Sequence, residues 1–405
     1  MVGGYQPAGF RHIMMVGGQR RGQARRLSAR GGWLALVVAA AAACGGNDEP
    51  AADPEATDPF AGLRVTSARG ATPVQPFLGL SPTAAEASPQ RLSETGVFAS
   101  LETLETVPGI IPFSVQAPLW TDGAHKQRWI AVPSGAQIGF SENEQWAFPA
   151  GTVLIKQFDM ALDERDPETL HRLETRILVM AEGGGYYGLV YRWDADQRDA
   201  QLIWDGADEM LDIIGEDGVS REQRYSYPKA RHCSGCHSVE RGTVRGVRTA
   251  QLNGDYDYGE GAGTHNQLAA WSALGVFDRE LDETPADAYP RLVGLEDDSA
   301  PVEARVRSYW DGNCSSCHVG DAHYPSWDAR FSTPLAEQRL LWAEPIDEPP
   351  VDGVHLITPG DPEHSYIYLR SSSADKPLRM PPGKNRVDDR YVELLREWIT
   401  SLPSP

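Results

Sequence analysis

Two short cysteine motifs contain the residues of this 405-residue sequence that are best suited to chemistry. They read Cys233-Ser-Gly-Cys236-His237 and Cys314-Ser-Ser-Cys317-His318, so both follow the pattern C-x-x-C-H. Two thiols at this spacing can form thioethers with the two vinyl groups of one haem, and the adjacent histidine can then bind the iron. The pattern predicts two covalently bound haem c groups per chain. The predicted attachment residues are Cys233, Cys236, Cys314 and Cys317, and the predicted iron ligands are His237 and His318.

Two other chemistries also use paired cysteines. Four thiolates can bind a zinc ion, and each pair can close a short disulfide in an oxidising compartment. Neither chemistry requires a histidine directly after both pairs, so both leave His237 and His318 unexplained. Haem attachment is the interpretation that uses every residue of the two motifs.

Four segments surround the second motif. They are Arg307-Ser-Tyr-Trp310, Pro359-Gly-Asp-Pro-Glu-His-Ser-Tyr366, Arg379-Met-Pro-Pro382 and Leu394-Leu-Arg-Glu-Trp-Ile399. Together with the motif they resemble a class I cytochrome c, in which the iron lies between the motif histidine and a methionine on a later loop. The resemblance implies that Met380 is the sixth ligand of the second haem, and that Trp310 and Trp398 meet where the first and last helices cross. A methionine there can also fill a gap in a core.

The distal ligand of the first haem stays open. No methionine lies between Met210 and Met380, so this haem has no downstream methionine of its own. His265 is one candidate, but it falls in the first turn of an expected helix, where an exposed polar residue is the ordinary explanation. A five-coordinate iron is another alternative. The remaining candidates are the upstream residues His125, Met160, His171, Met180 and Met210.

The N-terminal residues predict export and a lipid anchor. Residues 1–43 contain six arginines and no acidic residue, and an apolar run follows from Trp33 to Ala43. This run is shorter than the roughly 20 residues of a membrane-spanning helix and follows a basic region, as in a lipoprotein signal peptide. The sequence Ala41-Ala-Ala-Cys44-Gly45 resembles a bacterial lipobox, which implies an acylated Cys44 at the mature N-terminus. The alternative is ordinary cleavage beside an incidental cysteine.

Export and lipidation together define the expected location. Cytochrome c maturation takes place outside the cytoplasmic membrane, in agreement with an export signal. Gly45 after the cysteine resembles the sorting signal for the outer membrane. We therefore expect a lipid-anchored protein of the cell envelope, with its domains in the periplasm or at the cell surface.

The sequence is acidic, with 57 Asp and Glu against 37 Lys and Arg and a formal net charge of −20. This charge repels a phosphate backbone, so nucleic acid is not expected as a partner. Hydrophobic residues make up 41% of the chain, enough to build cores, which excludes a fully disordered protein. The expected partners are a redox donor and a redox acceptor, and the expected membrane contact is the N-terminal lipid.

The exported chain begins with two contrasting segments. Residues 44–91 are rich in Ala, Pro, Asp, Glu and Thr without periodicity, which predicts a disordered tether. Residues 92–107 contain apolar positions at helical spacing from Leu92 to Leu104, with Ser93 as the N-cap, which predicts an amphipathic helix.

The rest of the chain changes from strand to helix patterns. Residues 108–227 contain β-branched and aromatic runs, with a hairpin predicted from Leu173–Met180 and Tyr186–Trp193. Residues 228–299 and 300–405 contain one cysteine motif each and are expected to be helical. Predicted helices begin at Thr264 and span residues 302–312 and 390–402.

Five further segments outside the motifs contribute to a second family resemblance. They are Leu92-Ser-Glu-Thr-Gly-Val-Phe98, Ala117-Pro-Leu-Trp-Thr-Asp-Gly-Ala124, Phe148-Pro-Ala-Gly-Thr-Val153, Leu173-Glu-Thr-Arg176 and Gly246-Val-Arg-Thr-Ala-Gln-Leu-Asn253. With both motifs, they resemble an uncharacterised bacterial family of diheme c-type cytochrome lipoproteins. The resemblance implies an α+β multi-domain fold with two small helical cytochrome c domains, the first interrupted by a β-rich, sandwich-like insertion. Residues 92–107 would be the early helix of that first domain.

These features predict a periplasmic-facing diheme cytochrome that relays single electrons between redox partners, an electron carrier rather than a self-sufficient enzyme. The alternative is a diheme peroxidase or oxidase, in which the Met-ligated second haem supplies electrons to an open, five-coordinate first haem. A third interpretation assigns the β-rich segment its own ligand or partner.

Overall fold

The computed structural model describes residues 58–66, 88–166, 168–181, 185–230, 233, 244, 246–281, 284–320 and 327–403. These residues belong to one compact unit, Thr57–Pro405. The predicted signal peptide, Cys44, most of the predicted tether, and Cys236 and His237 of the first motif lie outside the described residues. None of the described helices is long and apolar enough to cross a membrane.

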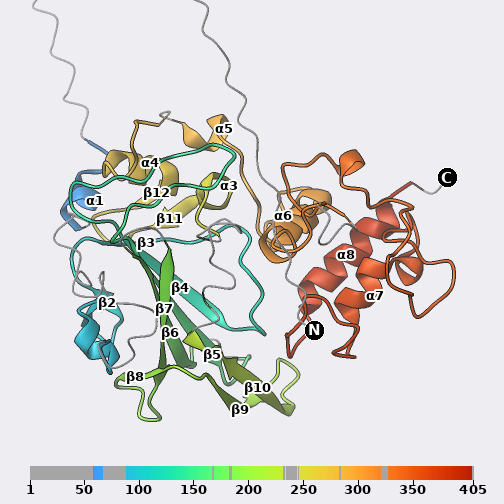
Figure 1. Ribbon diagram of the computed structural model, residues 1–405, viewed down its shortest axis with the longest axis horizontal. Helices are drawn as coiled ribbons and strands as arrows, with labels where there is room; N and C mark the ends of the chain where they lie inside the picture. The colour runs from blue at the N-terminus through green and yellow to red at the C-terminus, as the bar shows by residue number, and fades with distance from the viewer. Residues whose placement is uncertain are drawn as a thin grey trace, which may run out of the picture. The chain divides into compact units, whose positions relative to one another are not determined.

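A six-stranded antiparallel sheet occupies the centre of the fold (Figure 1). Its strands are neighbours in chain order: β3 Ile110–Pro112, β4 His125–Ala131, β5 Val153–Ala161, β6 Leu170–Met180, β7 Tyr186–Trp193 and β8 Ala200–Ile203. Their β-branched and aromatic residues suit a pleated, buried surface. The predicted hairpin is confirmed, because β6 pairs antiparallel with β7 from Met180 and Tyr186 onward.

The segment that precedes β3 in the chain packs against one face of the sheet. Ile155 and Tyr191 on this face pack with Leu92 and Val97. This segment contains the 3-10 turn η3 Leu92–Thr95 and the paired strands β1 Phe98–Ser100 and β2 Glu105–Thr106. The prediction of an amphipathic helix over residues 92–107 is therefore wrong.

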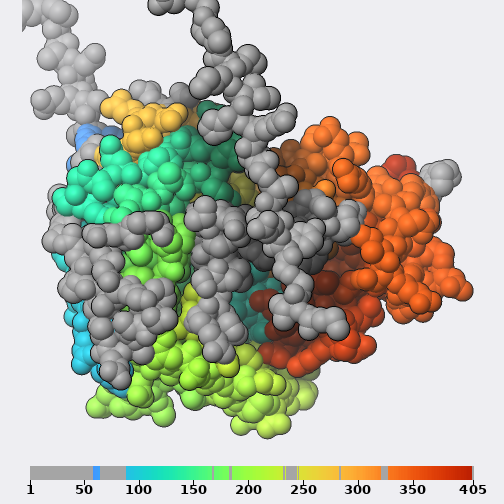
Figure 2. Space-filling model, viewed as in Figure 1, coloured from blue at the N-terminus to red at the C-terminus, as the bar shows by residue number. Residues whose placement is uncertain are grey.

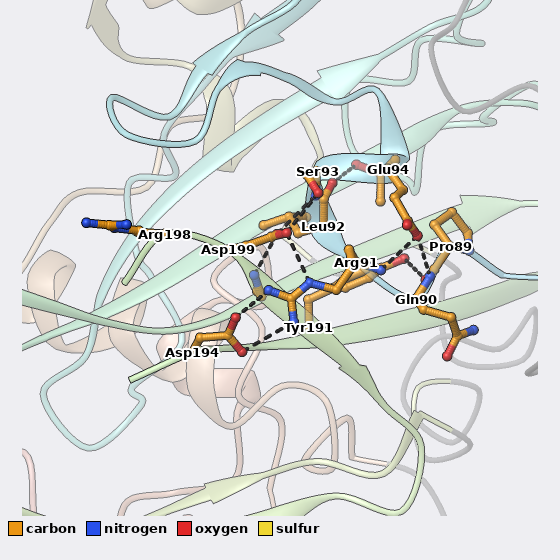
Figure 3. Close-up of polar contacts among 12 residues, drawn as sticks. Pro89, Gln90, Arg91, Leu92, Ser93, Glu94, Tyr191, Asp194, Arg198 and Asp199 are labelled. Atoms are coloured by element: carbon orange, nitrogen blue, oxygen red, sulfur yellow. Dashed lines mark hydrogen bonds and ion pairs between the residues drawn. The ribbon is translucent and has the colours of Figure 1, made fainter. Parts of the chain in front are cut away.

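Ion pairs explain why this segment does not become a helix. Arg91 pairs with Asp194 and Asp199, which lie in the connection between β7 and β8, and the Ser93 hydroxyl donates to Asp199 at 2.8 Å (Figure 3). The Tyr191 hydroxyl donates to the carbonyl of Pro89 at 3.0 Å. Ser93 thus binds a distant carboxylate instead of capping a helix, and contacts with the sheet override the local apolar spacing.

The opposite face of the sheet carries two separate apolar clusters. At one end, Ile130 and Leu154 pack with Leu252 and Trp271. At the other end, Phe158 packs against a two-stranded hairpin. The covering elements are α1 Ala61–Thr66, α3 Thr249–Leu252, β11 Asp255–Asp257, β12 Thr264–Asn266, α4 Gln267–Ala273 and α5 Pro285–Ala288 at the first end, and β9 Ala207–Ile214 and β10 Ser220–Tyr227 at the second. Leu63 of α1 is fully buried, so this short piece of the predicted tether belongs to the core.

The C-terminal residues contain the longest described helices. These residues comprise α6 Val302–Asn313, the 3-10 turns η6 Leu335–Glu337 and η7 Pro362–His364, α7 Tyr366–Ser372 and α8 Asp389–Ser401. Trp310 and Trp398 meet edge to face at 5.2 Å, and Tyr309 stacks on Tyr391 at 3.8 Å. The predicted helices near 302–312 and 390–402 and their aromatic contact are confirmed. Figure 2 shows these residues as one continuous body of orange to red atoms.

The expected fold class of two small helical cytochrome c domains is wrong, because the described chain is mostly antiparallel sheet with few helices. Between residues 246 and 281 the described helices are α3, with 4 residues, and α4, with 7 residues. These helices are too short to enclose a core of their own. They share one core with the sheet instead, because strands that are apolar on both faces must be covered on both.

Candidate functional site

A pocket of about 450 Å³ lies beside the second cysteine motif. It brings together Cys314, Cys317, His318 and Met380, the residues that the sequence assigns to the second haem. A volume of roughly 300 to 1,000 Å³ is usual for a cofactor site. Most of the remaining lining is apolar or aromatic: Tyr309, Trp327, Ile346, Leu356, Tyr366, Ile367, Pro381, Pro382 and Tyr391.

The motif is a tight turn that continues from the end of α6. Cys314 is the C-cap of this helix, and its backbone N–H donates to Trp310 at 2.7 Å. The backbone N–H groups of Cys317 and His318 both donate to the Cys314 carbonyl, at 3.0 and 2.9 Å. These bonds hold both thiols and the imidazole beside one pocket. Cys314 and Cys317 are free thiols in this structure.

Met380 reaches the pocket from a loop that arginines hold against α7. Its backbone N–H donates to the Arg370 carbonyl at 3.0 Å, and the Arg370 guanidinium donates to the Leu378 carbonyl at 2.8 Å. Arg379 is only 7% exposed and donates to the carbonyls of Ser373 and Ala374. Sequence reasoning missed both arginines, because their burial and their carbonyl partners are set by the tertiary structure.

Burial sets the charge of the ligand groups. It raises the pKa of the Cys314 thiol to about 12, with a smaller contribution from Cys317. Burial, and next Arg370, lower the pKa of His318 below its ordinary value. The imidazole is therefore neutral at pH 7 and has a nitrogen lone pair suited to a metal. Its ring stacks on Trp327 at 5.0 Å, which fixes its orientation.

The segment Ala117–Ala124, which contributes to the family resemblance, packs against the second motif. The Trp120 backbone N–H donates to the side chain of Asn313 at 2.6 Å, directly before Cys314. The Asp122 carboxylate accepts from the backbone N–H of Asn385 at 2.8 Å. Asp311 of α6 also pairs with Arg248, and the Asp311 side chain is 3% exposed. Residues far upstream in the sequence thus hold Asn313 from outside, whereas the pocket itself is lined by residues between Tyr309 and Tyr391.

Cys233 is the residue of the first motif that falls within the described part of the chain. It is half-buried and packs against Gly188 of β7, where a Cβ atom would overlap its sulfur. The first motif therefore begins on the face of the six-stranded sheet that carries Leu154 and Phe158. This placement separates Cys233 from Cys314, which follows a helix.

The predicted distal candidates for the first haem are spread over the structure. His265 lies in β12 and not in the first turn of α4, whose N-cap is Asn266. Its Nε2 lies 2.7 Å from the Ala262 carbonyl, and its ring lies 4.7 Å from that of Phe60. Met180 is buried on the sheet face that contacts Cys233, two residues along β6 from Leu178, the partner of Gly188.

The other upstream candidates have different surroundings. Met160 is buried in the cluster beneath the β9–β10 hairpin, whereas Met210 is 57% exposed. His125 is exposed at the start of β4, and His171 is half-buried on β6. Among the described residues, no group of three or more His, Cys, Asp or Glu side chains forms a metal site.

Comparison of the chain with protein-family models, with curated proteins and with solved structures gives no match. The functional assignment therefore rests on the residues of this chain. At the second motif, two thiols suited to covalent attachment and two groups suited to bind iron, an imidazole and a thioether, lie around an apolar pocket, and this set fits a covalently bound haem c.

Proposed function

We propose that this protein is a diheme c-type cytochrome of the cell envelope that relays single electrons between redox partners. The observation that carries the proposal is the pocket at the second motif. There, Cys314 and Cys317 would hold haem c through thioethers, and His318 and Met380 would bind its iron. When bound, haem c takes up and releases one electron, and methionine ligation raises its reduction potential.

The surrounding residues exclude water and hold the ligands. Trp327 fixes the ring of His318, and the bond from Met380 to the Arg370 carbonyl fixes the methionine loop. Tyr309 and Tyr391 stack beside the pocket and join α6 to α8. An apolar, rigid site of this kind suits electron transfer, because little has to reorganise when the charge changes.

A haem assay tests the proposal directly. We expect a pyridine haemochrome measurement on the full chain, produced with cytochrome c maturation, to give two haems per chain. One haem or none would refute the proposal.

Replacement of Met380 tests the ligand assignment. Met380→Ala is expected to remove the long-wavelength absorption band of methionine-ligated ferric haem, because the thioether is lost. The control is Val351→Ala, since Val351 is 43% exposed, has no part in either haem site and should leave the band unchanged. Persistence of the band in Met380→Ala would show that another group binds the iron.

An acidic and apolar surface at the pocket supports exchange with a basic partner. Ile346 is 64% exposed, and it lines the pocket together with Asp347. The side chains of Glu344 and Asp347 are 83% and 73% exposed, and Glu348 is exposed nearby. A redox protein with basic residues around an apolar patch would complement this surface.

Charge reversal tests this surface. The double variant Glu344→Lys/Glu348→Lys is expected to reduce the low-salt electron-transfer rate with a basic redox protein about tenfold, because electrostatic steering is lost. The control is Glu216→Lys/Glu222→Lys, two exposed positions in the β9–β10 hairpin with the same total change of charge. Equal slowing in the control would mean that net charge, not this surface, sets the rate.

A further inference from the structure

Three cationic side chains form a row across neighbouring strands of the central sheet. Arg128 of β4 is the register partner of Lys156 of β5, and Lys156 is the register partner of Arg176 of β6. Side chains directly opposite one another on antiparallel strands lie on the same face, and like charges in this arrangement destabilise the sheet. Lys126, two residues before Arg128, is on this face as well. Such a row needs an anionic counter-charge.

The described residues supply part of this counter-charge. Glu174 is fully buried and pairs with Arg176 at 2.5 Å. No described carboxylate forms an ion pair with Arg128 or Lys156. Lys156 instead lies 5.5 Å from the Phe158 ring, and Nη1 of Arg128 lies 3.5 Å from the Lys126 carbonyl.

Buried polar atoms in the row also lack hydrogen-bond partners. Nε of Arg176 and Oε2 of Glu174 are both buried without a partner in the described structure. Desolvation by burial holds the pKa of Lys156 well below its ordinary value, and the neighbouring cations act in the same direction. An anion bound at the row could accept a hydrogen bond from Nε of Arg176 and would favour the charged form of Lys156. It would leave Oε2 of Glu174 without a donor.

The first cysteine motif begins beside this row. Cys233 packs on Gly188, whose register partners across the sheet are Leu178 and then Leu154. The row Leu154–Leu178–Gly188 is two residues along the strands from the cationic row, on the same face. Because strands lie about 4.8 Å apart, Lys156 and Arg128 are roughly 10 and 14 Å across the sheet from Gly188. The row that contains Leu154 and Leu178 therefore meets Cys233 at Gly188. Arg128 and Lys156, which form no ion pair with a described carboxylate, lie farther from Cys233.

This arrangement matches the two edges of a haem. A haem c is attached at the edge that bears its vinyl-derived carbons, and it carries two propionate carboxylates at another edge. We propose that Lys156 and Arg128, together with Arg176, bind the propionate carboxylates of the haem attached through Cys233. The inference rests on the proposed function, since it requires a haem at the first motif. Charge-assisted hydrogen bonds from these cations would then orient the first haem over the sheet.

The row also has a consequence for the reduction potential. Cations near a haem favour its reduced form, which carries one positive charge less than the oxidised form. The first haem is therefore expected to have a higher potential with the row than without it. The second haem lies in a different pocket and is an internal reference.

The test is an optical redox titration of the full holoprotein carrying Arg128→Met and Lys156→Met. We expect the midpoint potential of the first haem to move to a more negative value while the second haem is unchanged. Met380→Ala identifies the second haem in the titration, because this substitution changes the midpoint potential of that haem. Lys156→Arg, which keeps the charge, should retain the wild-type potential. Arg224→Met removes an exposed cation from β10 and should move neither wave.

Haem content separates the two proposals. A wild-type protein with fewer than two haems refutes the proposed function itself. Two haems with unchanged potentials in the double variant refute propionate binding by the row and leave the proposed function standing. If the double variant does not accumulate, the single variant Lys156→Met is titrated instead, and the same shift of the first haem to a more negative midpoint potential is expected.

Discussion

The second cysteine motif follows the 12-residue helix α6, whereas the first begins at Cys233 against strand β7. Around the second motif, helices α6 and α8 and the loop of Met380 build a pocket from residues of the C-terminal region. Around the first motif, the neighbouring surface is a sheet whose strands come from residues 110–203. The same five-residue pattern therefore occurs in two different settings. A short motif defines covalent chemistry, but its surroundings define the other ligands and the electrostatics.

The largest expected effect concerns the helical setting. Trp398 is 2% exposed and contacts Trp310, so Trp398→Ala should lower the free energy of unfolding by about 3 to 5 kcal/mol through loss of burial and an internal cavity. Denaturant unfolding measures this loss. Val219→Ala is the control, because Val219 is 62% exposed and should change stability by less than about 0.5 kcal/mol. A loss below that level in Trp398→Ala would mean that the helix crossing does not support the pocket.

A smaller effect is expected at the sheet setting. A Cβ atom at Gly188 would overlap the sulfur of Cys233, so Gly188→Ala should destabilise the protein by about 1 to 3 kcal/mol through overpacking. It should also reduce haem content at the first motif and leave the second motif loaded, as measured by haemochrome assay. In the control Gly294→Ala, the added Cβ meets its nearest neighbour at 3.5 Å, an ordinary contact. If Gly188→Ala lowered the haem content of both motifs equally, the surroundings of the two motifs would not act independently.

The smallest effect is expected where the two settings meet. Glu164 pairs with Arg221 of β10 and with Arg386 before α8, both at 2.6 Å. Glu164→Gln should cost about 1 kcal/mol at pH 7, because two partly exposed ion pairs are weakened. The exposed residue Glu168 offers a control, Glu168→Gln, that should cost nothing measurable.

The pH dependence of this contribution has a definite sign. Hydrogen bonding from Arg221 is the largest cause that lowers the pKa of Glu164 in the folded state. A carboxylate with a lowered folded-state pKa stabilises the protein above its unfolded pKa, and this stabilisation is lost as the pH falls through the folded value. The difference between wild type and Glu164→Gln should therefore shrink in acid. A difference that grows in acid would contradict the ion-pair explanation.

The elements that could be predicted from sequence are those with strong local signals. The hairpin of β6 and β7, α6 and α8 each have a clear periodicity and clear ends, and the structure contains them close to the expected positions. The predictions that depended on more distant contacts failed. Residues 92–107 have helical spacing, but Arg91 and Ser93 bind carboxylates about a hundred positions later. Two helical domains were likewise expected, although the residues after the first motif share a core with the sheet.

The sequence by itself determined the two C-x-x-C-H motifs, because thiol spacing and an adjacent histidine are covalent properties of the chain. Only the tertiary structure decided that Met380 and His318 line one pocket, since this requires α7 and its arginines to hold the loop. It also decided that Arg128, Lys156 and Arg176 lie side by side on the sheet face that Cys233 contacts. These cations are far apart in sequence, and strand register alone places them in one row. Local chemistry is therefore encoded locally, whereas the charge and ligands around it depend on pairing between distant segments.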